Sequence, residues 1–313
     1  MSKPTKKSKK LRTSGDFSAI TTVGAFSTTF DTAKLFDVSY TETGDSPVDQ
    51  FIKNANALNL IYLKIKPPID PVLASLVFLG YISVFESYIR ALIRGVIYID
   101  EYAQRLVEKK SVSFGAAVHH SPKLLPEALL EEKSLAASNN IKTTLENYIG
   151  VKLQSSDIIK PLAEFNKLCH LRHCCIHRFG KLGTNNAIEL GLPTHKHLLE
   201  KPVIFKIEDI DNVVDTLRTL VKVINNETFK HILNRSVIYN KDNIDKNIKF
   251  KDYAGPFYSL SWSWVYKKDK KRFTKYYKLF ATKEDSIPSP SASELYRRFS
   301  ATMKLPFKPI DAA

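Results

Sequence analysis

The chain has 313 residues, of which 43% are hydrophobic and 11% aromatic, a composition that fits a folded protein with a substantial core and excludes a fully disordered or fibrous chain. Its formal net charge is +15, yet residues 13–236 contain 25 Lys and Arg against 24 Asp and Glu. The basic excess therefore lies at the two ends: residues 1–12 hold six Lys or Arg and no acid, and residues 237–313 hold 16 against 8. A glycine-rich phosphate loop and a nucleophile elbow are both absent from the sequence, and only 11 glycines disfavour a nucleotide-binding α/β fold.

Hydrophobic periodicity predicts a mainly α-helical protein. Residues 1–15 are expected to form a basic, disordered tail, and residues 16–49, rich in Thr and Ser, an irregular segment or a short hairpin. A helical domain is expected over 50–236 and a basic, aromatic-rich region over 237–313. The predicted helices lie near residues 48–65, 71–108, 123–149, 157–179, 207–235 and 291–302.

The second predicted helix is long and apolar enough to require a comparison with membrane spans. Pro71 to Phe85 is free of charge for 15 residues, fewer than the ~20 that cross a bilayer, and Glu86, Arg90 and Arg94 then interrupt the run. We therefore expect a buried helix and no membrane association. The three charges follow at i, i+4 and i+8, so Glu86 can form an ordinary helical ion pair with Arg90.

The helix expected over 157–179 carries a cationic end that its apolar periodicity does not explain. Its predicted buried stripe has three- and four-residue spacing and consists of Ile158, Leu162, Phe165, Cys169 and Ile176. Arg172 falls in phase with this stripe, and a buried guanidinium needs an anionic partner because it stays charged. His173 and His177 occupy the last turns, before Gly180 as the expected C′ residue. Cations at a helix C-terminus are also favoured by the macrodipole, by ~0.3–1 kcal/mol each, so ordinary helix capping is the competing interpretation.

The string Arg172-His173-Cys174-Cys175-Ile176-His177 resembles the signature of the HEPN superfamily, all-α proteins that include many metal-independent ribonucleases of defence and toxin systems. That signature is an Arg, four to six residues and a His, and the position after the Arg is often Asn, where this chain has His173. The resemblance covers about residues 50–236 and includes an earlier helix with an acidic residue, here Glu86. It implies a HEPN-like antiparallel helical bundle.

The resemblance also implies an endoribonuclease without a cofactor, in which the 2′-OH of the RNA is the nucleophile. Arg172 would hold the scissile phosphate, His177 would transfer the proton, His173 would assist either task, and Glu86 would orient Arg172 or a histidine. Family members usually form homodimers that join two motifs in one cleft, and an antitoxin or another defence-system protein is a candidate partner. The alternatives are a non-catalytic protein that binds RNA or a nucleotide, and an interaction protein whose motif only caps a helix.

The C-terminal region holds 15 of the 34 aromatic residues, interleaved with cations, a combination that suits unpaired bases. We expect RNA contacts from this region and from the end of the motif helix, through Arg178, Lys181, Lys267, Lys268, Lys271 and Arg272. Trp262 and Trp264 are expected to pack onto the helical domain. The alternation over residues 258–266 has the period of a strand and the Lys/Asp run after it is typical of a turn, with a small hairpin or a helix as alternatives.

Three cysteines, Cys169, Cys174 and Cys175, lie within seven positions, and this spacing and odd number do not make a disulfide framework. The Lys-rich N-terminus has no signal-peptide pattern, so we expect a cytoplasmic protein. His173 and His177 at i,i+4 raise the alternative of a metal site, but the two-segment ligand spacing of zinc sites is absent. We therefore expect no metal.

Overall fold

The computed structural model of the chain describes residues 20–21, 23–24, 26–122, 124–237 and 262–304. The predicted tail (1–15) and the first part of the predicted C-terminal region (238–261) lie outside these residues. The chain divides into two units, residues 1–44 and 45–313. In the first unit, the described residues are exposed and contain one short helix, η1 (Thr32–Leu35).

The second unit contains the helical core, and the prediction of a mainly α-helical protein is confirmed. The described residues form no strand, and an isolated bridge joins Lys181 to Pro202. The helices are α1 (Pro47–Tyr62), α2 (Pro71–Ile99), α3 (Glu101–Val107), α4 (Phe114–His119), α5 (Leu125–Ala128), α6 (Ser138–Ile149), α7 (Ser156–Arg178), α8 (Thr184–Glu189), α9 (Leu192–His195), η2 (Lys196–Leu198), α10 (Ile207–Ser236), α11 (Tyr266–Phe280) and α12 (Ala292–Lys304).

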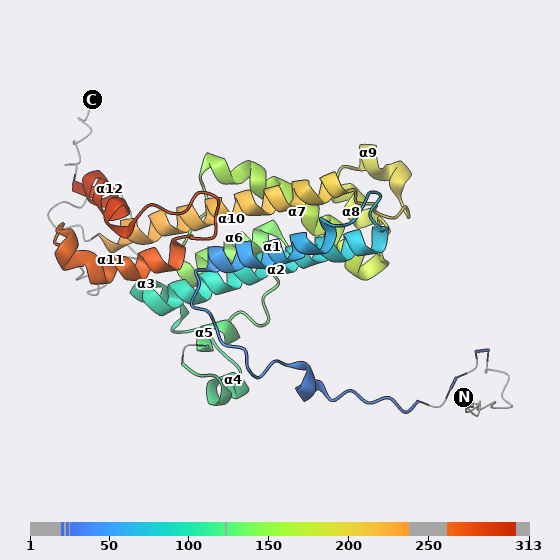
Figure 1. Cartoon of the computed structure of the whole chain (residues 1–313), viewed down its shortest axis with the longest axis horizontal. Helices are drawn as coiled ribbons and strands as arrows, with labels where there is room; N and C mark the ends of the chain where they lie inside the picture. Colours follow the sequence, from blue (N-terminus) through green and yellow to red (C-terminus); the bar gives the residue numbers. More distant parts are fainter. Residues whose placement is uncertain (1–19, 22, 25, 123, 238–261, 305–313) are drawn as a thin grey trace, which may run out of the picture. The chain divides into compact units, whose positions relative to one another are not determined.

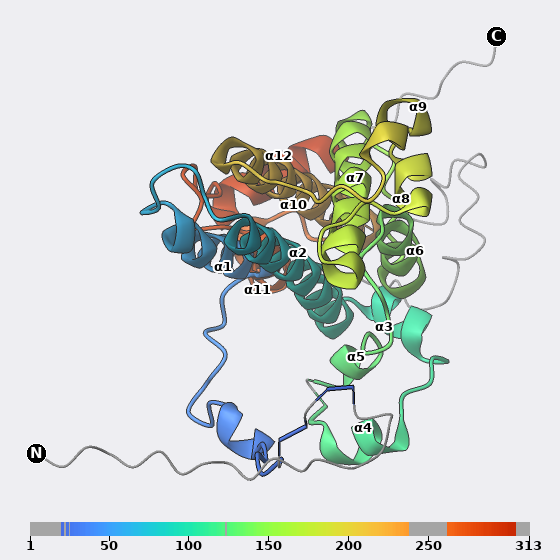
Figure 2. The same ribbon diagram turned by 90° about the vertical axis from the view of Figure 1, so that its right-hand side faces the viewer.

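Helix α2 lies in the middle of this unit and packs against α1, α3, α5, α6, α7, α10 and α11 (Figures 1 and 2). Its N-cap is Asp70, whose carboxylate accepts the backbone N–H groups of Val72 and Leu73 and so satisfies two otherwise unpaired donors. Phe85 and Ile89 are among its fully buried side chains. By length and composition alone α2 could also cross a membrane, a test that the buried central helix of a bundle passes equally well.

The prediction of a single helix over 71–108 is wrong, because the helix is interrupted at Asp100. This residue ends α2 and is the N-cap of α3, where its carboxylate accepts the N–H of Ala103. Arg235, from the last turn of α10, donates to the same carboxylate at 2.5 Å, and both side chains are only 5% exposed. Arg235 also donates to the carbonyl of Ile149. The Arg235 guanidinium thus joins the end of α10 to the end of α2 through the ion pair and to the end of α6 through a hydrogen bond.

The helix predicted over 123–149 is also two helices, α5 and α6, and the Lys/Asp run predicted as a turn is the first part of α11. Asp269 explains this start, because its buried carboxylate accepts the backbone N–H groups of Ser263 and Trp264 and the hydroxyl of Tyr296. Trp262 is buried, as predicted, and its indole N–H donates to the carbonyl of Ser236. No strand is present over 262–266, and 258–261 lie outside the described residues.

The buried ion pair between Arg235 and Asp100 should contribute to the stability of the protein. Replacing Arg235 by Ala leaves the Asp100 carboxylate in the interior without its counter-charge, and we expect the free energy of unfolding to fall by about 3–5 kcal/mol. Urea unfolding of the two proteins measures this difference. Lys230→Ala, on the exposed side of the same helix, is the control and should change stability by less than about 0.5 kcal/mol. Equal effects of the two substitutions would show that the pair does not hold the helices together.

Candidate functional site

The motif lies at the C-terminal end of α7, where the buried side of the helix changes. Ile158, Leu162, Phe165 and Cys169 face the core as predicted. Ile176, which was predicted to continue this stripe, is 47% exposed instead. The reason is a second, small hydrophobic cluster formed by Cys174, Leu182 and Ala187. In its last turns α7 therefore buries Cys174 against α8 and the residues before it. The exposed face of the same turns carries the two histidines.

Helix α7 ends one residue earlier than the sequence suggested. Phe179 is the C-cap, at φ 50°, so Gly180, at φ 89°, is the C′ residue as predicted, and the N–H groups of both residues donate to the carbonyl of Cys174. A left-handed conformation is uncommon for a residue with a bulky side chain. The Phe179 ring is nevertheless 82% exposed. It was not recognised from the sequence as part of the site, and its position directly after the motif is the signal that could have identified it.

The segment after α7 returns to it and places the motif beside the start of α10. Backbone hydrogen bonds connect Gly180 with Val203 and Leu182 with Lys201, and Figure 2 shows α8 and α9 beside the end of α7. Arg178 helps to close this segment: its guanidinium donates to Glu200 at 2.6 Å and lies so close to Gly183 that a Cβ there would meet Nη1 at 2.5 Å. Arg178, which the sequence predicted as an RNA contact, therefore has a structural partner already.

Arg172 meets an acidic side chain from another helix, as its place in the apolar stripe predicted. Its Nη2 atom lies 3.9 Å from Oε1 of Glu86 on α2, and the two side chains are 29% and 23% exposed. That Oε1 atom is buried and accepts no hydrogen bond from the described residues. Burial raises the pKa of Glu86, and the charges of Arg172 and Arg90 act in the opposite direction.

Arg90, the other partner considered for Glu86, points to a different part of the unit. Its guanidinium donates to the carbonyls of Leu130 and Lys133 and lies 3.8 Å from Glu127. Of the two ion pairs that the sequence left open for Glu86, the described residues therefore form the one with Arg172. This pairing joins α2 to the motif.

The two histidines of the motif lie side by side on the exposed face, with ring centroids 4.6 Å apart. Burial lowers the pKa of His173, and the neighbouring charges of His177, His170 and Arg172 lower it further. The imidazole of His173 is therefore more completely neutral near pH 7 than an isolated histidine, and its ring can accept a proton.

A third histidine and an asparagine form hydrogen bonds next to the motif. His170 lies between Asn166, at 3.4 Å, and Asn186 of α8, at 3.2 Å. Asn186 also donates to the sulfur of Cys174 at 3.3 Å, so its side chain joins α8 to two turns of α7. Asn186 could not be selected from the sequence, because its role depends on how the segment after α7 folds back onto that helix.

Two of the three cysteines of the site, Cys169 and Cys175, do not have the properties of nucleophiles. Burial raises the pKa of Cys169 to about 12, and the negative charge of Glu86 contributes in the same direction. Burial also raises the pKa of Cys175. Because the thiolate is the reactive form, these two thiols are unreactive near neutral pH. The described residues contain no group of three or more His, Cys, Asp or Glu side chains suited to a metal ion.

The basic cluster of α11 is not part of the motif site. Lys267, Lys268 and Lys271 are exposed, and Arg272 lies over the ring of Trp262, 5.0 Å from its centroid. Trp262 is bound to the last residue of α10, whereas the motif lies beside the first. Since α10 has 30 residues, about 45 Å separates its two ends. Figure 1 accordingly shows α8 and α9 at one end of α10 and α11 and α12 at the other.

No protein-family model, curated protein or solved structure matches this chain. The chemistry of the motif residues and their neighbours is therefore the basis on which a function can be proposed.

The Glu86 pair predicts how Arg172→Ala acts on stability. Because the Glu86 pKa in the folded protein is raised above its ordinary value of 4.5, stability falls as the pH rises from that value through the folded-state pKa. Arg172→Ala removes a charge that lowers this pKa, so the fall becomes larger. Arg172→Ala should lower the free energy of unfolding, relative to wild type, by about 1 kcal/mol more near pH 7 than near pH 4. The figure is modest because the pair is partly exposed.

Urea unfolding over this pH range provides the measurement, and Glu86→Gln added to Arg172→Ala provides the control. With no carboxyl left to titrate, the double variant should lose the pH-dependent part of the effect. If Arg172→Ala costs the same at both pH values, Arg172 is not the counter-charge of Glu86.

Proposed function

We propose that the protein is a metal-independent endoribonuclease of the HEPN type. One observation carries the proposal: Arg172, His173 and His177 share the exposed end of one helix, and a carboxylate from a second helix lies 3.9 Å from the guanidinium. A guanidinium binds phosphate oxygens through paired donors, and imidazoles transfer protons near neutral pH. These are the groups that cleavage of RNA by its own 2′-OH requires.

The proposed reaction is a transesterification. The 2′-oxygen attacks the adjacent phosphorus and loses its proton to a base, while the bond to the 5′-oxygen breaks and that oxygen receives a proton. The products are a 2′,3′-cyclic phosphate and a 5′-hydroxyl. His177 is the proposed proton-transfer group, and His173, whose pKa is lowered by burial and by the neighbouring charges, is the proposed acceptor of the 2′-OH proton.

Arg172 is the proposed ligand of the scissile phosphate. Its contact with Glu86 is longer than a hydrogen bond, so its donors are not all occupied by the carboxylate. A phosphate at the exposed side of the guanidinium would accept hydrogen bonds from the remaining donors. The guanidinium would also stabilise the charge that develops on the phosphate oxygens in the transition state. Glu86 is a positioning residue in this scheme.

A homodimer is part of the proposal. Ile176 and Phe179, at 47% and 82% exposure, flank His177 on the surface, and exposed apolar side chains of this kind suit contact with a second copy or with a base. A twofold contact at this face would bring two motifs together. A role in phage defence or in a toxin system, with an antitoxin as the partner, is part of the proposal only because the motif resembles that of HEPN proteins.

The proposed activity predicts cleavage of total cellular RNA in excess EDTA, with cyclic phosphate ends on the fragments. Arg172→Ala and His177→Ala should each lower the cleavage rate by at least about 100-fold, because one removes charge stabilisation and the other a proton-transfer group. Gel analysis of the fragments, with chemical identification of their 2′,3′ ends, measures both effects.

His119→Ala is the matched control, since His119 is an exposed histidine on α4, and it should cleave at the wild-type rate. Thermal unfolding of each variant shows whether the fold is retained. Cleavage by His177→Ala at the wild-type rate would contradict the proposal. RNA binding without cleavage by the wild-type protein would favour the alternative of a non-catalytic RNA-binding protein.

A further inference from the structure

The outward face of α11 carries lysines and no acidic side chain, and we call it the lysine face. Its members are all exposed and consist of Lys267, Lys268, Lys270, Lys271, Lys275 and Lys278. From Lys267, three of the others follow at i+4, i+8 and i+11, so four ammonium groups form a row along one side of the helix, about 16 Å long. The one acidic residue of α11 is Asp269, which is buried on the opposite side. The exposed side of this helix is therefore cationic throughout.

None of these lysines forms an ion pair with another of the described residues. Cations on the neighbouring helices do have acidic partners. Glu294 of α12 binds both Arg297 and Arg298, and Lys222 of α10 lies 2.7 Å from Asp285. Like charges three or four positions apart on a helix repel each other, and a bound polyanion would remove this repulsion. The lysine face is thus suited to a partner with many negative charges.

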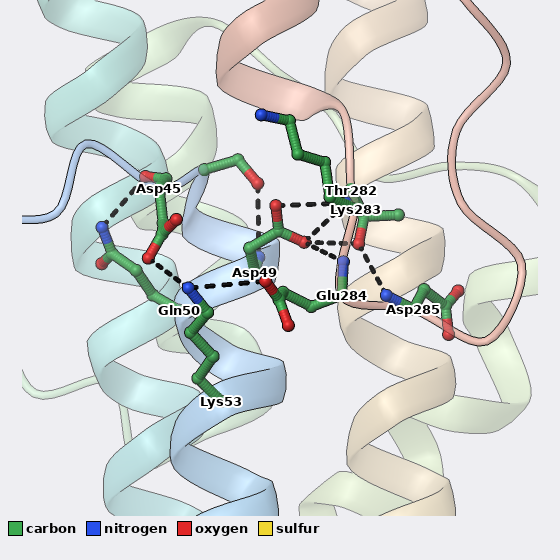
Figure 3. A network of polar contacts seen from close by, with 9 residues as sticks. Asp45, Asp49, Gln50, Lys53, Thr282, Lys283, Glu284 and Asp285 are labelled. Atoms are coloured by element: carbon green, nitrogen blue, oxygen red, sulfur yellow. Dashed lines mark hydrogen bonds and ion pairs between the residues drawn. The ribbon is translucent and has the colours of Figure 1, made fainter.

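Both ends of α11 are fixed to the rest of the helical unit. Its start is held by Asp269, as described above. At its end, Asn225 of α10 donates to the carbonyl of Phe280 at 2.8 Å. Asp49 of α1 then accepts the hydroxyl of Thr282 at 2.5 Å and the backbone N–H groups of the next two residues at 3.0 and 3.1 Å (Figure 3). Because the helix is held in place, the lysine face needs little rearrangement when a partner binds.

The aromatic side chains of α11 are used for packing inside the protein. Those on the side opposite the lysine face are buried and consist of Phe273, Tyr276 and Phe280. The ring of Tyr266 packs on that of Tyr296, with centroids 5.3 Å apart, and the hydroxyl of Tyr277 donates to the carbonyl of Pro290. The sequence suggested rings and cations suited to unpaired bases, but α11 presents cations without exposed rings. Such a surface contacts phosphate groups and does not read bases.

A nucleic-acid duplex has the charge density that matches this face. It carries one negative charge per ~1.7 Å of its axis, hence about nine along the ~16 Å of the lysine row, and a single strand carries half as many. A membrane surface is a poorer match. An amphipathic helix binds there by burying its apolar side in the lipid, and the apolar side of α11 is already buried in the protein.

We propose that the lysine face of α11 binds the phosphate backbone of a nucleic-acid duplex, independently of its sequence. This surface lies at the opposite end of α10 from the motif and uses no motif residue. One part of the inference rests on the proposed function: for a ribonuclease, the duplex is a stem of the substrate RNA.

The test is fluorescence anisotropy of a labelled RNA duplex of roughly 20 base pairs, made uncleavable by 2′-O-methyl groups and titrated with the full-length protein at several salt concentrations. One variant combines Lys267→Gln, Lys271→Gln, Lys275→Gln and Lys278→Gln. Glutamine preserves helix propensity, and thermal unfolding shows whether the fold is retained. We expect at least about tenfold weaker binding and a slope of log affinity against log salt that is smaller by about 3–4, since four phosphate contacts are lost.

The control variant removes the same amount of charge from exposed lysines outside α11 and combines Lys109→Gln, Lys133→Gln, Lys142→Gln and Lys230→Gln. It should keep the wild-type affinity within about threefold and the wild-type salt slope within about one unit. A DNA duplex of the same length is the second probe. Binding of either duplex through the lysine row supports the proposal, and binding of the DNA duplex alone separates this surface from the proposed ribonuclease function.

Three results would overturn the proposal. The first is equal affinity of the two multiple variants for both duplexes. The second is binding of a single strand as tight as that of the duplex, which would assign the interaction to bases. The third is binding of polyglutamate or of phosphatidylserine vesicles with no binding of either duplex, which would assign the lysine face to an acidic protein or to a lipid surface.

Discussion

The arrangement of the helices depends on the need to pair charges inside the bundle. Within the described residues, helix α2 packs against seven other helices, yet it carries three charged side chains and ends at a buried aspartate. Glu86 is met by Arg172 of α7, the two arginines of α2 are met by α5 and the segment after it, and Asp100 is met by Arg235 of α10. An uncompensated charge in the interior costs several kcal/mol. The registers of α5, α7 and α10 against α2 are therefore restricted to those that supply a partner.

The ion pair between Glu86 and Arg172 also determines where the guanidinium of the motif lies. Glu86 holds Arg172 at the border of the core, where the guanidinium is still 29% exposed and can meet an external anion. The packing of Cys174 against α8 turns the other face of α7 outward, and this face carries His173 and His177. A structural charge pair and an exposed pair of imidazoles thus share one helix end, which is the basis of the proposed phosphate chemistry.

Local periodicity was enough to predict the long helices, because α1, α7 and α10 each have an apolar stripe and clear end signals. It did not predict the break at Asp100, since the interaction that stabilises the break comes from Arg235, 135 positions away. The start of α11 depends on Asp269 and its contact with Tyr296, which is also a tertiary contact. At the site, the sequence identified the motif residues, but which partner Glu86 takes was decided by packing and could not be read from spacing.

The measurement that tests the central claim most directly is an NMR titration with RNA made uncleavable by 2′-O-methyl groups. If the motif is a phosphate-binding site, the guanidinium signal of Arg172 and the imidazole signals of His173 and His177 should shift together and saturate, while those of His119 stay unchanged. High salt should weaken the binding, because phosphate contacts release counterions. Shifts confined to the lysines of α11, with the motif signals unchanged, would contradict the account.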